Sequence, residues 1–159
     1  MRKSELLGKL KDEGKLALVE PSADICDSYL EKAENSLKSA KVLLQNNLYE
    51  NSIPMSYYAM YNSLVALLFR AGIKSENHSA SIILLKELFG RIDLYKTISF
   101  AKKERVDKQY YVDFTLTEES AEDLFGKAED FLVKLKLMIK NLRNEDISGA
   151  RKEFGRLLG

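Results

Sequence analysis

The sequence contains few of the residues that build disulfides and metal sites. Among its 159 residues there are one cysteine, one histidine and no tryptophan. A single cysteine excludes a disulfide within the chain. Cys26 and His78 together cannot supply the four ligands of an ordinary structural zinc site. We therefore expect no metal site, and no motif indicates a cofactor.

Long apolar runs and an excess of one charge are also missing. The longest apolar run, Leu64–Phe69, is far too short to span a bilayer. The first residues are basic but lead into acidic ones, so we expect no signal peptide there. The formal net charge of +1 provides no overall attraction to nucleic acid or membrane, so a phosphate site would have to be local. We expect a cytoplasmic protein without membrane association.

The remaining composition is that of a globular protein. Hydrophobic residues make up 45% of the chain and charged residues 31%, which argues against disorder. The length suits one domain with a sizeable core. We predict a single helical domain over residues 1–159, with its core in 23–142 and peripheral helical extensions in 1–21 and 143–159.

Apolar residues recur at helical spacing through most of the chain, whereas strand-like alternation is nearly absent. In the first long segment the apolar stripe runs from Ile25 to Leu44, and in the last from Leu124 to Leu142. Short joints between long amphipathic helices favour antiparallel neighbours. The pattern predicts an all-α, antiparallel, up-and-down bundle of four to five helices with extra short terminal helices. The expected helices cover residues 4–11, 23–46, 49–71, 79–89, 94–109, 117–142 and 147–158, and residues 108–117 are expected to form a connection.

Local residues set the expected ends of these helices. Ser22 and Thr117 are suitable N-caps, each followed by acidic residues in the first turn. Gly72 and Gly90 are placed to end helices. The predicted core contains Leu37, Leu64, Leu68, Phe131 and Leu135.

Three tyrosines fall within one and a half turns of the second long helix. Tyr57 and Tyr61 share one face, and Tyr58 lies about 100° around the helix from Tyr57. Aromatic core packing explains such a cluster, and so does a surface that contacts a partner. Because one face cannot direct all three rings into the same core, we expect an exposed aromatic patch and a homodimer.

His78 is the only side chain whose ordinary pKa lies near neutrality. It follows a basic, polar joint and precedes a predicted helix, where backbone N–H groups favour an anion. A capping or surface role and a chemical role both suit this position. The run Lys102-Lys103-Glu104-Arg105 is interpreted as a solvated helix face, with phosphate contact as the alternative.

These segments together resemble the HEPN family, named for higher-eukaryote and prokaryote nucleotide-binding domains. The resemblance lies in the run from Ser56 to Tyr61, followed by Gly72, then His78-Ser79 and finally Arg105-Val106-Asp107. It covers roughly residues 23–140. The family implies a helical bundle that is usually dimeric. It also implies either RNA cleavage or partnership with a small, separately encoded nucleotidyltransferase.

The resemblance also indicates site residues. The catalytic candidates are His78, Arg70 and Arg105, and the candidates for binding a nucleotide or phosphate are Tyr58, His78, Ser79 and Arg105. Seven residues separate Arg70 from His78, which is more than in active family members. We therefore favour the nucleotide- or partner-binding half of a two-component system. The alternative is a metal-independent endoribonuclease toxin of a toxin–antitoxin pair, with His78 transferring a proton and an arginine holding the phosphate.

Overall fold

The computed structural model describes residues 2–110 and 118–159, and for residues 107–110 it describes the backbone alone. The described residues form an all-α antiparallel bundle with one small sheet, which confirms the predicted fold class. The elements are α1 (Lys3–Asp12), β1 (Leu16–Leu18), α2 (Ala23–Gln45), α3 (Tyr49–Arg70), β2 (Ile73–Ser75), α4 (His78–Phe89), α5 (Ile92–Tyr110), α6 (Glu118–Asn141) and α7 (Asn144–Leu158).

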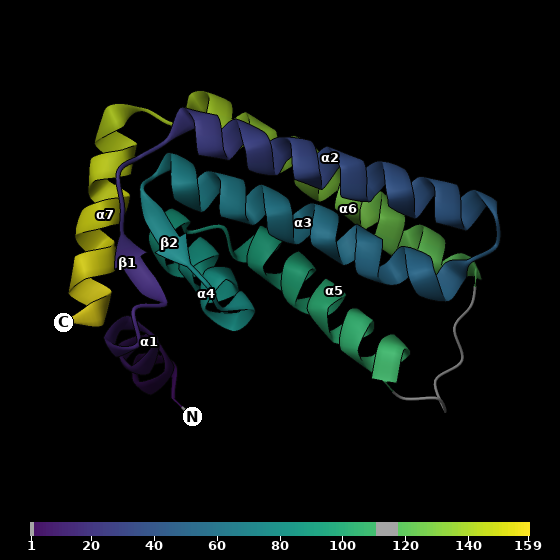
Figure 1. The fold of residues 1–159 in the computed structure, drawn as a ribbon, viewed down its shortest axis with the longest axis horizontal. Helices are drawn as coiled ribbons and strands as arrows, with labels where there is room; N and C mark the ends of the chain where they lie inside the picture. Colours follow the sequence, from purple (N-terminus) through teal and green to yellow (C-terminus); the bar gives the residue numbers. More distant parts are fainter. Residues whose placement is uncertain (1, 111–117) are drawn as a thin grey trace.

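The long helices α2, α3 and α6 run side by side along the length of the molecule, and α4 and α5 pack below α3 (Figure 1). At one end α7 stands across the bundle, next to α1 and the two strands (Figure 1). None of the described helices is long and apolar enough to cross a membrane.

The most extensive packing is between α2 and α3, which form a helical hairpin. Their short connection turns at Asn47, whose φ of 61° lies in the left-handed region that asparagine tolerates. Small side chains line the contact surfaces: Ala33 and Ala40 of α2 and Ala59 and Ser63 of α3 are fully buried. Their size lets the two helices approach closely.

Four of the five predicted core residues are fully enclosed. Leu64, Phe131 and Leu135 have no exposed surface, and Leu68 is 1% exposed. Leu37 is only partly buried and packs against this core. The expected stripe of the first long helix was wrong at its beginning, because Ile25 is 41% exposed on the first turn of α2, where little packs over it.

Capping residues mark the starts and ends of the helices largely as predicted. The Ser22 hydroxyl accepts a hydrogen bond from the Ile25 N–H at 3.1 Å, which fixes the start of α2. Gly72 and Gly90 follow α3 and α4 with φ of 76° and 65°, a conformation that glycine adopts without strain. The predicted Thr117 cap and most of the connection expected over 108–117 lie outside the described residues.

The two-stranded sheet was not predicted. β1 and β2 pair antiparallel, with Leu16 opposite Ser75 and Leu18 opposite Ile73. Each strand has only three residues and their partners are far apart in the sequence, so no alternation was long enough to reveal them. The sheet ties the N-terminal segment to the chain that leads from α3 to α4.

Arg151 of α7 closes the junction next to this sheet. Its Nη1 atom donates to the carbonyl oxygens of Val19 and Gly72, both at 2.7 Å. A Cβ atom added at Gly72 would lie 2.2 Å from that Nη1 and 2.5 Å from the Val19 oxygen. The junction therefore requires glycine for space as well as for its left-handed backbone.

The polar joint after β2 positions the beginning of α4. The Asn77 side-chain oxygen accepts a hydrogen bond from the Ala80 N–H at 2.9 Å and acts as N-cap. The helix therefore starts at His78, one residue earlier than predicted. This places His78 and Ser79 in its first turn, over the middle of α3.

Candidate functional site

His78 packs on two tyrosines of α3. Its Nδ1 atom lies 2.7 Å from the hydroxyl oxygen of Tyr57, and its ring stacks on that of Tyr61 with centroids 3.7 Å apart. Tyr57 is completely buried and Tyr61 is 9% exposed. The hydrogen bond and the stacking together fix the orientation of the imidazole ring.

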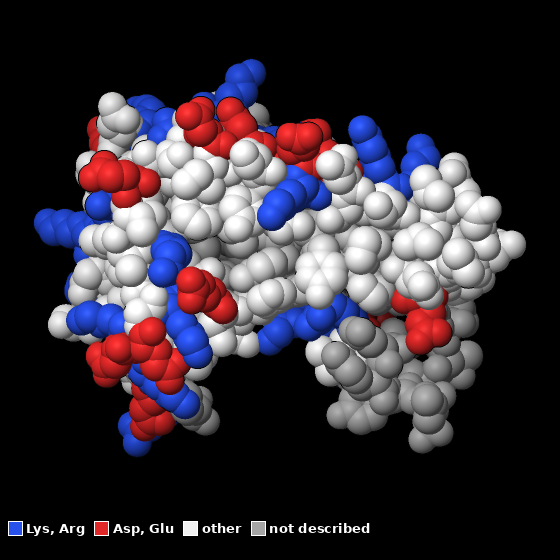
Figure 2. Space-filling model, viewed as in Figure 1, with Lys and Arg blue, Asp and Glu red and all other residues white. Residues whose placement is uncertain are grey.

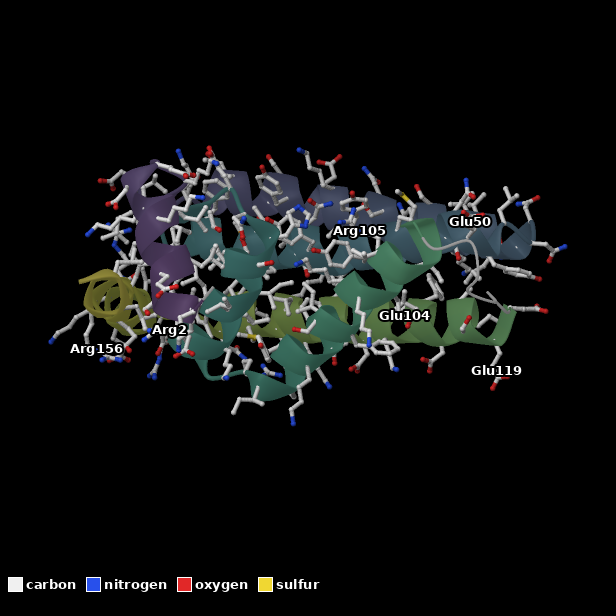
Figure 3. The ribbon with its side chains drawn as sticks, turned by 90° about the horizontal axis from the view of Figure 1, so that it is seen from below. Arg2, Glu50, Glu104, Arg105, Glu119 and Arg156 are labelled. Atoms are coloured by element: carbon white, nitrogen blue, oxygen red, sulfur yellow. The ribbon has the colours of Figure 1, made fainter. Side chains whose placement is uncertain are left out.

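Arg105 reaches the same tyrosines from α5. Its Nη1 atom donates to the Tyr58 hydroxyl at 3.0 Å, and its guanidinium carbon lies 5.1 Å from the ring centroid of Tyr57. Figure 3 shows Arg105 on the edge of α5 nearest α3, away from the neighbouring Glu104. The Nε atom of Arg105 is buried and has no hydrogen-bond partner among the described residues. Part of this guanidinium is therefore desolvated without a described acceptor.

Lys102 adds a second cation one turn earlier on α5. Its ammonium group donates to the Ser79 hydroxyl at 2.6 Å. His78 and Ser79 are the first two residues of α4, where backbone N–H groups have no acceptor within the helix and favour an anion. We call His78, Ser79, Lys102 and Arg105 the anion site. Figure 2 shows a largely uncharged band over α3, with basic side chains gathered at its lower edge.

Burial and like charges set the protonation of the site. Burial, followed by the positive charges of Arg105 and Lys102, lowers the pKa of His78 below its ordinary value of 6.5. Burial, followed by the charge of Arg105, lowers the pKa of Lys102. Burial raises the pKa of Tyr57, which keeps its hydroxyl protonated. No described carboxylate forms an ion pair with these three basic side chains.

The structure brings most of the predicted site residues together. Tyr58, His78, Ser79 and Arg105 meet where α3, α4 and α5 converge. Arg70 does not join them: within the described part of the chain, no hydrogen bond, ion pair or ring contact links it to His78. It ends α3, and its charge acts on the Cys26 thiol of α2 instead.

Sequence reasoning missed Lys102 as a member of the site, because charged runs on helices usually face solvent. The available signal was its spacing from Arg105: side chains three residues apart lie on the same helix face. The exposed aromatic patch was also wrong. Tyr57 and Tyr61 are enclosed beneath α4, and only Tyr58 is half-buried.

Potential metal ligands are sparse around the site. Among the side chains of residues 2–106 and 118–159, no group of three or more from histidine, cysteine, aspartate or glutamate is arranged to hold a metal ion. The side chains that converge here are instead hydrogen-bond donors and cations.

The model of the HEPN domain matches residues 26–138 of this chain. The chain belongs to the HEPN family. The matched part contains all of α3, α4 and α5, and with them the anion site. It leaves α1, β1 and α7 outside, so Arg151 and the carbonyl of Val19 belong to additions around the family domain.

Similar HEPN-type relatives occur in archaea and bacteria. Two proteins of Methanocaldococcus jannaschii that carry the name "putative toxin" are 30% and 28% identical. The matches cover 71% and 73% of this chain and 87% and 84% of those proteins. A protein of Thermotoga maritima named "UPF0332 protein" is 27% identical over 75% of this chain and 94% of its own length.

Proposed function

We propose that this HEPN protein binds the phosphate group of a nucleotide or RNA at the anion site. In this proposal it acts as the nucleotide-binding half of a two-component system whose other half is a separately encoded nucleotidyltransferase. The observation that carries the proposal is the convergence of His78, Lys102 and Arg105 without a described carboxylate to neutralise them. A bound phosphate would supply that missing negative charge and accept hydrogen bonds from the cationic side chains of the site.

The hydrogen bond between Tyr57 and His78 favours binding over proton abstraction. The buried Tyr57 hydroxyl has His78 Nδ1 as its only hydrogen-bond partner among the described residues. If Nδ1 carried the proton, the Tyr57 hydroxyl hydrogen would be buried without an acceptor, which is costly. Tyr57 therefore donates to Nδ1, and neutral His78 carries its proton on Nε2. In this tautomer Nε2 is a donor to an anion and has no free lone pair to act as a base.

Metal-independent RNA cleavage is the second candidate function. It is supported by the meeting of a histidine and an arginine on one tyrosine and by the toxin name carried by two relatives. Cleavage would need one group to deprotonate the 2′-hydroxyl and another to protonate the leaving oxygen. His78 can serve only one of these roles at a time, so a second His78 from a symmetric dimer would have to provide the other.

Fluorescence anisotropy with a labelled single-stranded RNA, together with a cleavage assay, tests the proposal. We expect salt-dependent binding without cleavage. Arg105→Met should weaken binding and reduce the slope of log affinity against log salt by about one, the effect of one lost phosphate contact. A slope and affinity unchanged by Arg105→Met would contradict phosphate binding at this site. Cleavage that His78→Ala abolishes would instead support the nuclease function.

The partnership and the oligomeric state extend the same proposal. We propose a homodimer, supported by the family resemblance and no longer by an exposed aromatic patch. Light scattering at tens of micromolar protein tests it, and a monomer mass would refute it. Copurification with a separately encoded nucleotidyltransferase from the same organism, when the two proteins are expressed together, would support the two-component arrangement.

A further inference from the structure

A groove between α4 and α5 opens beside the anion site. Its volume is about 420 Å³, within the range of roughly 300–1,000 Å³ typical of small-molecule sites. Ser79 and Lys102, which belong to the anion site, also line the groove. The two sites are therefore continuous, and their common boundary is the 2.6 Å hydrogen bond between these side chains.

One face of each helix forms the walls. On α4, Ile82 and Ile83 lie three and four residues after Ser79, so all three share a helix face. On α5, Tyr95, Ser99 and Lys102 recur at helical spacing. The walls are thus apolar at Ile82, Ile83, Tyr95 and Val106 and also contain two serine hydroxyls and two lysines, Lys102 and Lys103. No carboxylate is present among the described lining residues.

We infer that this groove holds the nucleoside part of a nucleoside monophosphate unit whose phosphate lies at the anion site. This inference rests on the proposed phosphate binding and specifies its ligand. A nucleobase has flat apolar faces and a polar edge, which suit Ile82, Ile83 and Tyr95 as walls and the Ser99 hydroxyl as a hydrogen-bond partner. Lys102, at the boundary, is placed to contact the phosphate while the base enters the groove.

The unit can be a free mononucleotide or one residue of an RNA strand, because both present the same nucleoside phosphate. Both sources must meet the same condition: the base has to be unpaired and accessible in order to enter the groove. Stacking of a base on an aromatic side chain strengthens binding roughly 5- to 150-fold, the equivalent of about 1–3 kcal/mol. With Tyr95 in the wall, a nucleoside monophosphate should therefore bind at least about fivefold more tightly than inorganic phosphate.

Isothermal titration calorimetry with inorganic phosphate, ribose 5-phosphate and adenosine 5′-monophosphate tests the groove. We expect adenosine monophosphate to bind at least about fivefold more tightly than the other two. Ser99→Phe fills the groove and should reduce the nucleotide affinity to that of phosphate while leaving phosphate binding unchanged. The matched control is Ser39→Phe, which places the same ring on an exposed turn of α2 and should change neither affinity.

Methyl NMR of the unmodified chain provides a test that does not depend on the folding of Ser99→Phe. The methyl signals of Ile82 and Ile83 should shift with adenosine monophosphate or a short single-stranded RNA, but not with phosphate. Shifts with either ligand support the inference, and shifts with only one of them identify the source.

Equal affinities for phosphate and nucleotide, with unmoved isoleucine methyl signals, would overturn the groove assignment and leave phosphate binding intact. Binding of neither phosphate nor nucleotide would overturn both. Retention of full nucleotide affinity by folded Ser99→Phe would also contradict the groove assignment.

Discussion

Arg151 and Arg105 differ in how the structure accommodates their charge. Arg151 of α7 donates to the carbonyl oxygens of Val19 and Gly72, with a longer contact of 3.5 Å to Ala71. Among the described residues, Arg105 of α5 has one hydrogen-bond partner, the Tyr58 hydroxyl, and its buried Nε has none. Carbonyl dipoles thus compensate the charge of Arg151, whereas that of Arg105 lies over aromatic rings beside other cations.

This difference separates a structural role from a binding role. A buried donor without an acceptor reduces stability, so a fold gains nothing from leaving Arg105 in that state. A ligand that supplies an acceptor gains the full free energy of that hydrogen bond. We therefore expect the Arg151 junction to matter for stability and the Arg105 site to matter for binding.

The largest stability loss should come from the backbone at the Arg151 junction. Gly72→Ala adds a Cβ atom where Arg151 and Val19 leave no space, at a φ of 76°. We expect the free energy of unfolding to fall by about 3 kcal/mol or more, measured by urea denaturation. Gly126→Ala is the matched control: it lies within α6 with nothing within 4 Å of the new Cβ, so alanine should be neutral or stabilising by up to about 1 kcal/mol. Similar effects of the two variants would contradict this account of the junction.

Removing the Arg151 charge should have the next largest effect. Arg151→Met leaves the carbonyls of Val19 and Gly72 without this donor, and we expect a loss of about 2 kcal/mol in the free energy of unfolding. Arg156→Met on the same helix removes an exposed ion pair with Glu153 and should cost less than about 1 kcal/mol. Phosphate affinity should remain unchanged in both. Weaker phosphate binding by folded Arg151→Met would show that the two regions are not separate.

Methionine at Arg105 should weaken ligand binding and leave stability nearly unchanged, the opposite of its effect at Arg151. Arg105→Met removes a half-buried cation whose Nε has no described acceptor and keeps much of the side-chain volume, so the free energy of unfolding should change by less than about 1 kcal/mol. Affinity for a nucleoside monophosphate should fall roughly 10- to 100-fold, as expected for the loss of a hydrogen bond between charged groups. Calorimetry and urea denaturation on one preparation measure both quantities. A large stability loss with unchanged affinity would assign Arg105 a structural role.

The smallest expected effect is a pH dependence of stability due to His78. Its pKa is lowered in the folded chain, by burial first, so the unfolded chain takes up this proton at higher pH. Acidification through the ordinary value of 6.5 therefore favours unfolding, and the free energy of unfolding should decline as the pH falls below that value. His78→Gln should lack this part of the decline. Parallel pH profiles for the two proteins would contradict the lowered pKa.

The parts of the molecule that were predictable from sequence are those fixed by local chemistry. Helical spacing identified the long helices, and Ser22, Gly72 and Gly90 marked their ends, because capping depends on residues a few positions away. The pairing of β1 with β2 was not predictable, since it joins segments separated by two long helices. A resemblance in motif order identified the family, which periodicity alone cannot do.

The candidate site was predictable only in part, for the same reason. His78 and Arg105 were identified by residue type and position in the family pattern. The sequence placed Arg70 close to His78 along the chain, but the intervening turn and strand lead away from the end of α3. Lys102 takes part instead, and only the packing of α5 against α4 reveals it. The enclosure of Tyr57 and Tyr61 likewise depends on how α4 crosses α3.

The central claim is that the anion site binds phosphate, and the single histidine provides a direct probe of it. The imidazole Cε1–H signal of His78 can be followed by NMR against pH, with and without a dinucleoside monophosphate. Its phosphodiester keeps one negative charge throughout the titration, so it does not contribute a titration of its own. We predict a pKa below 6.5 in the free protein and a higher pKa with ligand, because the bound anion favours the imidazolium. Identical titration curves with and without saturating ligand would contradict the claim.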